Sequence, residues 1–321
     1  MLLKKIKTNY LDKLFSDLVN QNDFLKIHHE LDKLKNEDIE LYFLFQNRIL
    51  NTYLNNDVGQ SFFQNKIIWL NSFDLDDTKI IENFLSFYLN AKLNVNLNGD
   101  LYLNEFQKLP KELIDKNINF NDLVENSYIY QYEILKHANV KHKLILNNHV
   151  FFEKLPNKFF THYYLTQCFY YVIRNPIHIY VKFRSKFDSQ QNALNFLNDS
   201  SNNDIGAMNE NGAQIENTTK DWSTNVLSWT NLNVINTFRG QIIKFEELIN
   251  NPEQILAESI SHLVQSGIDI EIDYDLIGKY VNDNRDKFSK NVLEEINISN
   301  QELKKLKREL GEVSKKFSYN I

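Results

Sequence analysis

The sequence predicts an α/β protein in which helices cover both faces of a mostly parallel sheet. Four short apolar runs have the length and the β-branched or aromatic content of buried strands, namely 67–70, 144–146, 169–173 and 241–245. Segments with helical spacing separate these runs, for example Ile80 to Leu89 after the first and about Pro252 to Gln265 after the last. Strands that alternate with helices are typical of βαβ units, so we expect a three-layer α/β/α architecture.

Composition and charge narrow the class of protein. The 321 residues are 42% hydrophobic and 24% charged, which suits one large globular domain or a domain with an extension. The formal net charge of −6 offers no basic field for nucleic acid or an anionic membrane. A single cysteine, Cys168, allows no intramolecular disulfide and no thiolate cluster. Since no signal peptide or membrane-spanning segment is recognisable, we predict a cytoplasmic protein without nucleic-acid or membrane partners.

The first 64 residues differ in pattern from the rest of the chain. They show apolar residues at helical spacing, with short polar breaks at 20–23 and 35–38. We therefore expect a small stack of antiparallel helices over residues 1–64, followed by the α/β domain over residues 65–321. These N-terminal helices are a candidate surface for a partner protein.

The stretch from Phe169 to Phe187, FYYVIRNPIHIYVKFRSKF, carries the clearest functional signal. Its apolar run ends in Arg174, Asn175 and Pro176, and proline suits the first turn of a helix. Arg174 is thus expected at the carboxyl end of a buried strand, the edge where open α/β sheets bind ligands. A guanidinium there can hold a phosphate through two parallel hydrogen bonds. The alternative is an arginine that pairs with a surface carboxylate.

Four segments together resemble the sulfotransferase family, whose members use 3′-phosphoadenylyl sulfate (PAPS) on a P-loop-like α/β fold. The resemblance lies in their order and spacing and covers roughly Lys66 to the C-terminus. The segments are KIIWLNSF…FLSFYL (Lys66–Leu89), FYYVIRNPIHIYVKF (from Phe169), DWSTNVLSWTN (Asp221–Asn231) and QIIKFEELINNPEQIL (Gln241–Leu256).

The resemblance implies roles for individual residues. It makes Arg174 a ligand of the nucleotide 3′-phosphate. Lys182 replaces a serine of the family and can still meet the phosphate as a point charge. Glu246 is expected to be structural, the alternative being a catalytic role. His149 follows a strand where the family often has Lys-Thr-His, which would make it the base for the acceptor; the alternative is a histidine that only forms structural hydrogen bonds. PAPS would be the cofactor and a small molecule or a glycan the acceptor. We predict no metal site.

The loop after the first strand departs from the family pattern. Members read roughly Tyr-Pro-Lys-Ser-Gly-Thr/Asn-Thr there, and backbone N–H groups and the lysine cradle the 5′-phosphosulfate. This chain has Asp74 at the proline position, Leu75 at the lysine position and Asp77 at the glycine position. One carboxylate about 6 Å from a phosphate charge costs about 2–3 kcal/mol at an effective dielectric near 20.

The acidic loop is also expected to cap the helix that follows it. Asp76, Asp77 and Thr78 are residue types that accept hydrogen bonds from helix N–H groups. Ordinary PAPS binding is therefore not expected. Two functions stay open: transfer of a sulfuryl group from PAPS to a hydroxyl or amine, and a catalytically inactive scaffold that binds a phosphorylated ligand or a partner protein.

Overall fold

The computed structural model divides the chain into two compact units. The residues it describes are 2–21, 23–56, 66–93, 128–137, 142–147, 151, 153–155, 158–159, 161–184, 186–187, 189–198, 221–289, 297–319 and 321. The first unit comprises residues 1–66, 102–143 and 152–165, and the second comprises residues 67–101, 144–151 and 166–321. The chain thus returns to the first unit twice after residue 66, and the predicted division into 1–64 and 65–321 stays a prediction.

The first unit is mainly a set of packed helices, which agrees with the predicted helical pattern. Its elements are α1 (Leu2–Asn20), α2 (Phe24–Glu37), α3 (Ile39–Asn56), α8 (Tyr128–His137), β3 (Glu153–Leu155) and β4 (Lys158–Phe159). Aromatic rings join the helices: Phe15 lies 5.1 Å from Phe45 and Tyr53 stacks at 5.0 Å on Tyr132 (centroid distances). The first break falls as predicted, since Asp23 caps α2. The second is shorter than the predicted 35–38, because α2 runs to Glu37 and one residue, Asp38, separates it from α3.

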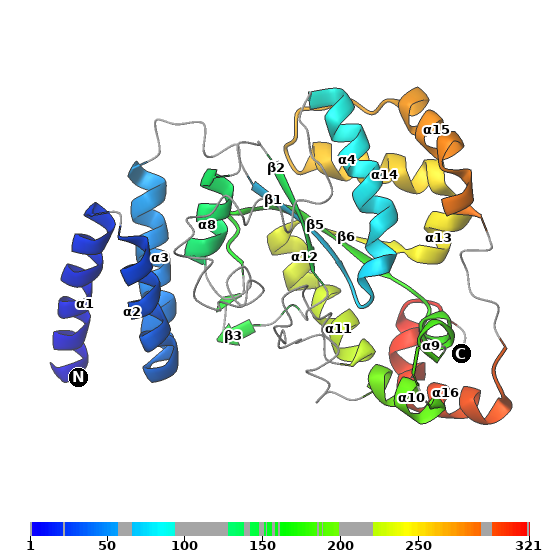
Figure 1. Cartoon of the computed structure of the whole chain (residues 1–321), viewed down its shortest axis with the longest axis horizontal. Helices are drawn as coiled ribbons and strands as arrows, with labels where there is room; N and C mark the ends of the chain where they lie inside the picture. Colours follow the sequence, from blue (N-terminus) through cyan, green and yellow to red (C-terminus); the bar gives the residue numbers. More distant parts are fainter. Residues whose placement is uncertain are drawn as a thin grey trace. The chain divides into compact units, whose positions relative to one another are not determined.

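The second unit is built on a four-stranded sheet of order β2-β1-β5-β6 (Figure 1). The pairs β1–β5 and β5–β6 are parallel, which confirms the predicted parallel sheet. Each predicted apolar run lies in one strand, although the last strand ends one residue early because Phe245 begins a helix. The strands are β1 (Lys66–Ser72), β2 (His142–Asn147), β5 (Thr166–Ile173) and β6 (Gly240–Lys244).

Side chains of β5 show that helices cover both faces of this sheet. Tyr170 donates from its hydroxyl to the Ser259 carbonyl of α14 (Pro252–Gln265), at 2.7 Å. Its neighbour Tyr171 points the other way and donates to Asn225 of α11 (Trp222–Trp229), at 2.8 Å. All eight residues of β5 are buried, as expected for a strand covered on both faces.

The remaining helices fall into two groups, one on each side of the sheet of this unit (Figure 1). With α14 lie α4 (Lys79–Leu93) and α15 (Tyr274–Asp283). With α11 lie α9 (Pro176–Arg184), α10 (Gln190–Asn198), α12 (Leu232–Phe238) and α16 (Asn300–Lys316). Short elements complete the unit: the 3-10 turn η2 (Leu75–Thr78), α13 (Phe245–Asn250) and the 3-10 turn η4 (Arg285–Phe288).

Candidate functional site at the carboxyl ends of β1 and β5

The order of the strands makes the carboxyl ends of β1 and β5 a topological switch point. From β1 the chain continues to α4 and later to β2 on one side, whereas from β5 it continues to α9 and later to β6 on the other side. A sheet whose connections diverge in this way binds ligands outside the carboxyl ends of the two strands. The acidic loop after Ser72 and the Arg174 turn after Ile173 both lie at this place.

The acidic loop folds into the 3-10 turn η2 and satisfies its own backbone groups. The Asp74 side chain accepts a hydrogen bond from the Asp76 N–H at 3.2 Å, and the Asp74 carbonyl accepts one from the Asp77 N–H at 2.9 Å. Thr78 donates from its hydroxyl to the Leu75 carbonyl at 2.7 Å. The cap was expected from Asp76, Asp77 and Thr78; the residue that caps η2 is Asp74, which leaves the Asp77 carboxylate for another partner.

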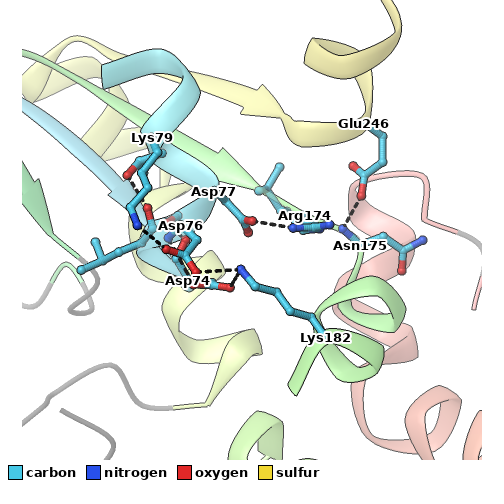
Figure 2. Close-up of polar contacts among 12 residues, drawn as sticks. Asp74, Asp76, Asp77, Lys79, Arg174, Asn175, Lys182 and Glu246 are labelled. Atoms are coloured by element: carbon cyan, nitrogen blue, oxygen red, sulfur yellow. Dashed lines mark hydrogen bonds and ion pairs between the residues drawn. The ribbon is translucent and has the colours of Figure 1, made fainter. Parts of the chain in front are cut away.

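That partner is Arg174. Its Nη1 lies 2.7 Å from Asp77 Oδ1, and the two side chains are only 3% and 2% exposed (Figure 2). The guanidinium also lies over the Phe245 ring, 4.3 Å from its centroid. The predicted alternative for Arg174 was a surface carboxylate; the structure provides a carboxylate, but a buried one. An ion pair in this setting is costly to disrupt, because either charge would be left buried alone.

Burial raises the pKa of Asp77 to about 7. Arg174 opposes this rise, while the neighbouring Asp74 carboxylate adds to it. The desolvation of the carboxylate is thus the largest influence on its pKa, larger than the attraction of Arg174, to which Lys182 adds.

A second, more exposed set of ion pairs surrounds Lys182. Its Nζ contacts an Asp74 carboxylate oxygen and lies 3.3 Å from Asp76 Oδ2 (Figure 2). Lys79 completes the set at 2.7 Å from Asp76 Oδ1. The hydrogen bond from Lys79 lowers the pKa of Asp76 to about 2. Burial acts to lower the pKa of Lys182, but the attraction of Asp74 and its neighbours prevails and raises it.

The carboxylates and cations described at this site are therefore equal in number and paired with one another. Three carboxylates of the turn face three cations: Asp77 meets Arg174, Asp74 meets Lys182, and Asp76 meets Lys79 and Lys182. A phosphate at this edge would compete with carboxylates that the protein itself supplies. The arrangement is suited to holding the two strand ends together, and an external anion would have to displace part of it.

The structure brings together two of the three predicted site residues. Arg174 and Lys182 both reach the acidic turn, whereas His149 lies outside the described residues. Glu246 accepts a hydrogen bond from the Asn175 N–H at 2.8 Å, which fits the structural role expected for it.

Sequence reasoning missed the pairing of the acidic turn with the basic strand end. The acidic residues were predicted to repel a phosphate and to cap a helix, and neither expectation included a cationic partner. A usable signal was present, because three new carboxylates after one strand are matched by Arg174 and Lys182 after another. Recognising it required the knowledge that β1 and β5 are neighbours.

Comparisons with protein-family models and with curated proteins found no match for this chain. Within the described residues, no helix is both long and apolar enough to cross a membrane. The same part of the chain holds no group of three or more histidine, cysteine, aspartate or glutamate side chains that could bind a metal ion.

Proposed function

We propose that this chain is a sulfotransferase-family protein whose own carboxylates take the place of the nucleotide phosphates. In this proposal it is a binding or scaffold protein and does not transfer a sulfuryl group from PAPS. The observation that carries the proposal is the buried ion pair between Arg174 and Asp77, 2.7 Å apart. The family resemblance assigns Arg174 to the 3′-phosphate, but the positive charge of Arg174 is already neutralised by Asp77.

The family part of the proposal rests on the four similar segments and on their arrangement. The strand that ends in Arg174 lies beside the strand that ends in the altered phosphate loop, and the connections diverge between them. This is the edge at which a nucleotide would bind in an α/β protein of this kind. The parallel sheet supports the α/β fold class, whereas the proposed membership of the sulfotransferase family depends on the four similar segments.

An energetic argument supports the loss of nucleotide binding. A phosphate that recruited Arg174 would leave Asp77 without its cation in a buried place, at a cost of about 3–5 kcal/mol. Each 1.4 kcal/mol corresponds to a factor of ten, so the affinity would fall by roughly a hundredfold to several thousandfold. Loss of the family's phosphate-loop lysine, replaced by Leu75, adds to this deficit.

The test is a titration of the full chain with 3′-phosphoadenosine 5′-phosphate, followed by thermal unfolding. A ligand at 100 times its Kd stabilises a protein by about 2.7 kcal/mol. We expect no increase in Tm for the natural sequence at millimolar ligand. The double variant Asp74→Asn/Asp77→Asn should gain binding and an increased Tm, because neutral amides of the same shape release Lys182 and Arg174 from their carboxylates.

A matched control separates this local effect from a change in net charge. Asp221 and Asp273 cap helices outside the acidic turn, and Asp221→Asn/Asp273→Asn removes the same two negative charges. We expect no binding in this control. A double variant at Asp74 and Asp77 that binds no better than the control would contradict the proposal that these carboxylates occupy the phosphate site.

The second candidate function is sulfuryl transfer from PAPS to a small-molecule or glycan acceptor, with His149 as the base. The run Arg174-Asn175-Pro176 at the carboxyl end of β5 favours it, since the family resemblance places the 3′-phosphate there. An increase in Tm with the natural sequence, abolished by Arg174→Ala, would support this function and overturn the first. Transfer of labelled sulfate from PAPS would then identify the acceptor. The binding function would instead involve a partner protein, either at this edge or at α1–α3.

A further inference from the structure

The chain turns back on itself after α16 and inserts its last tyrosine into the second unit. Ser318 adopts a φ of +61°, in the left-handed region that serine rarely occupies. The turn is closed by hydrogen bonds from the Ser318 N–H to the Lys315 carbonyl and from the Tyr319 N–H to the Ser314 carbonyl, both 3.0 Å. This unfavourable backbone conformation directs Tyr319 inward, where it is buried.

The Tyr319 hydroxyl reaches the carboxyl end of β5. It lies 2.9 Å from Glu246 Oε2 and 3.2 Å from the Ile173 carbonyl oxygen, so its single hydrogen is shared between two acceptors. The other carboxylate oxygen of Glu246 accepts from the Asn175 N–H at 2.8 Å (Figure 2). The carbonyl before Arg174 and the N–H after it are thus both held through Tyr319 and Glu246.

The surroundings keep Tyr319 in its neutral, donating form. Burial raises its pKa above the ordinary value, and the Glu246 carboxylate raises it further. Lys244, the last residue of β6, places its ammonium 5.9 Å from the centroid of the Tyr319 ring and pairs with Glu247 at 3.2 Å. The hydroxyl therefore stays protonated at neutral pH and can donate its hydrogen.

We infer that Tyr319 is a positioning residue for Arg174: the C-terminal turn holds the two peptide groups on either side of Arg174 and thereby directs its guanidinium toward Asp77. The inference does not depend on the proposed function, because it concerns how the arginine is held and not which anion it meets. The residues that follow α16 are then part of the strand-end site, although they lie 145 positions after Arg174 in the sequence.

Amide hydrogen exchange of the full chain, measured by NMR, tests this inference at the Asn175 N–H. Tyr319→Phe keeps the ring and removes the donor to Glu246, so we expect Asn175 to exchange about tenfold faster, as for a lost hydrogen bond to a charged group. Tyr180→Phe is the matched control: it also removes a tyrosine hydroxyl bound to a buried glutamate, Glu302, at the other end of α16. We expect no change at Asn175 in this control.

A second readout separates positioning from simple packing. If Tyr319 directs Arg174, then Tyr319→Phe weakens the attraction of Arg174 for Asp77 and raises the pKa of the Asp77 carboxyl by up to about one unit, measured by carbon-13 NMR titration. Unchanged exchange at Asn175 together with an unchanged Asp77 titration would overturn the inference. Equal acceleration at Asn175 in both tyrosine variants would also overturn it, because that result indicates general destabilisation.

Ser318→Gly is expected to change amide exchange at Asn175 in the opposite direction to Tyr319→Phe. Glycine adopts a φ near +60° without strain, so this change favours the turn that presents Tyr319. We expect slower exchange at Asn175, by about threefold to fivefold, and an unchanged fold. Faster exchange in Ser318→Gly would contradict the inference even if Tyr319→Phe failed to fold. None of these measurements uses a nucleotide, so their failure is distinguishable from failure of the proposed function.

Discussion

Two buried carboxylates in the second unit are stabilised in opposite ways. Asp77 has one close cation, Arg174, and burial raises its pKa to about 7. For Glu302, burial also acts to raise the pKa, but hydrogen bonds from Ser299 and Tyr180 prevail and lower it to about 2. Ser299 alone donates twice, from its N–H at 2.7 Å and its hydroxyl at 2.6 Å. At Asp77 desolvation outweighs the attraction of Arg174 and Lys182, whereas at Glu302 the hydrogen bonds outweigh a desolvation that acts in the same direction.

The difference also separates a structural site from a candidate functional one. Glu302 forms a capping box with Ser299 at the start of α16 and also accepts hydrogen bonds from Tyr180 and Arg184, so its role there is structural. The Asp77 carboxyl has a raised pKa and lies at the sheet edge where α/β proteins commonly bind ligands. Strongly perturbed carboxyls in such places are candidates for functional residues.

Asp77→Ala is expected to lower the free energy of unfolding by about 3–5 kcal/mol, because it leaves the Arg174 guanidinium buried without its anion. Urea unfolding of the full chain measures this loss. The double variant Asp77→Ala/Arg174→Met should recover much of it, since no charge then remains at this position. A loss of less than 1 kcal/mol in Asp77→Ala would show that the ion pair is not what holds the strand ends together.

Glu302→Ala is expected to cost less, about 2 kcal/mol, through the lost capping box and the lost hydrogen bond from Tyr180. The cation near Glu302 is Arg184, whose side chain is 27% exposed and can turn toward water. No buried charge is therefore stranded, in contrast to Arg174. Urea unfolding of Glu302→Ala and Tyr180→Phe should show that the tyrosine accounts for about half of the loss. A loss at Glu302 that exceeds the loss at Asp77 would reverse the comparison.

The strands of the candidate site were predictable from the sequence, for a clear physical reason. A strand covered on both faces, such as β5, becomes a continuous apolar run, and the charged residue that ends it stands out. Arg174 was recognised in this way. The helix α8 was not among the elements predicted from the sequence.

The pairings within the site could not be predicted in the same way. Arg174 and Asp77 are 97 positions apart, and they meet because β1 and β5 are neighbours in the sheet. Tyr319 meets Glu246 only because α16 packs where it does and then turns back at Ser318. Periodicity identifies the elements, but long-range pairing depends on their order in space.

The two carboxyls should also give opposite pH dependences. The pKa of Asp77 is about 7 in the folded state against 3.8 as its ordinary value, so the folded state binds more protons and Asp77 makes stability fall as pH rises from about 4 to 7. The pKa of Glu302 is about 2 against 4.5, so its contribution is complete above pH 4.5 and is lost as pH falls toward 2.

Urea unfolding between pH 3 and pH 8 measures both effects. The free energy of unfolding of Asp77→Asn, measured against that of the natural sequence, should increase as pH rises through this range. The slope should reach up to about 1.4 kcal/mol per pH unit. Glu302→Gln should lose the most unfolding free energy above pH 5, and its stability should approach that of the natural sequence at the acid end. Parallel curves for the two variants would show that both carboxyls share one kind of environment.

The smallest effect is expected at the exposed margin of the acidic turn. Lys79 and Asp76 lie 2.7 Å apart, but their side chains are 61% and 46% exposed. Water and salt screen such a pair, so Lys79→Ala should cost less than about 1 kcal/mol, and the cost should shrink further at 1 M salt. The Asp77–Arg174 pair belongs to the same turn and differs mainly in burial. Urea unfolding of Lys79→Ala at low and high salt, compared with Asp77→Ala, therefore isolates burial as the variable. If Lys79→Ala lowered the free energy of unfolding as much as Asp77→Ala does, the turn would act as one charged cluster. Burial of the Asp77–Arg174 pair would then not be what makes that pair important.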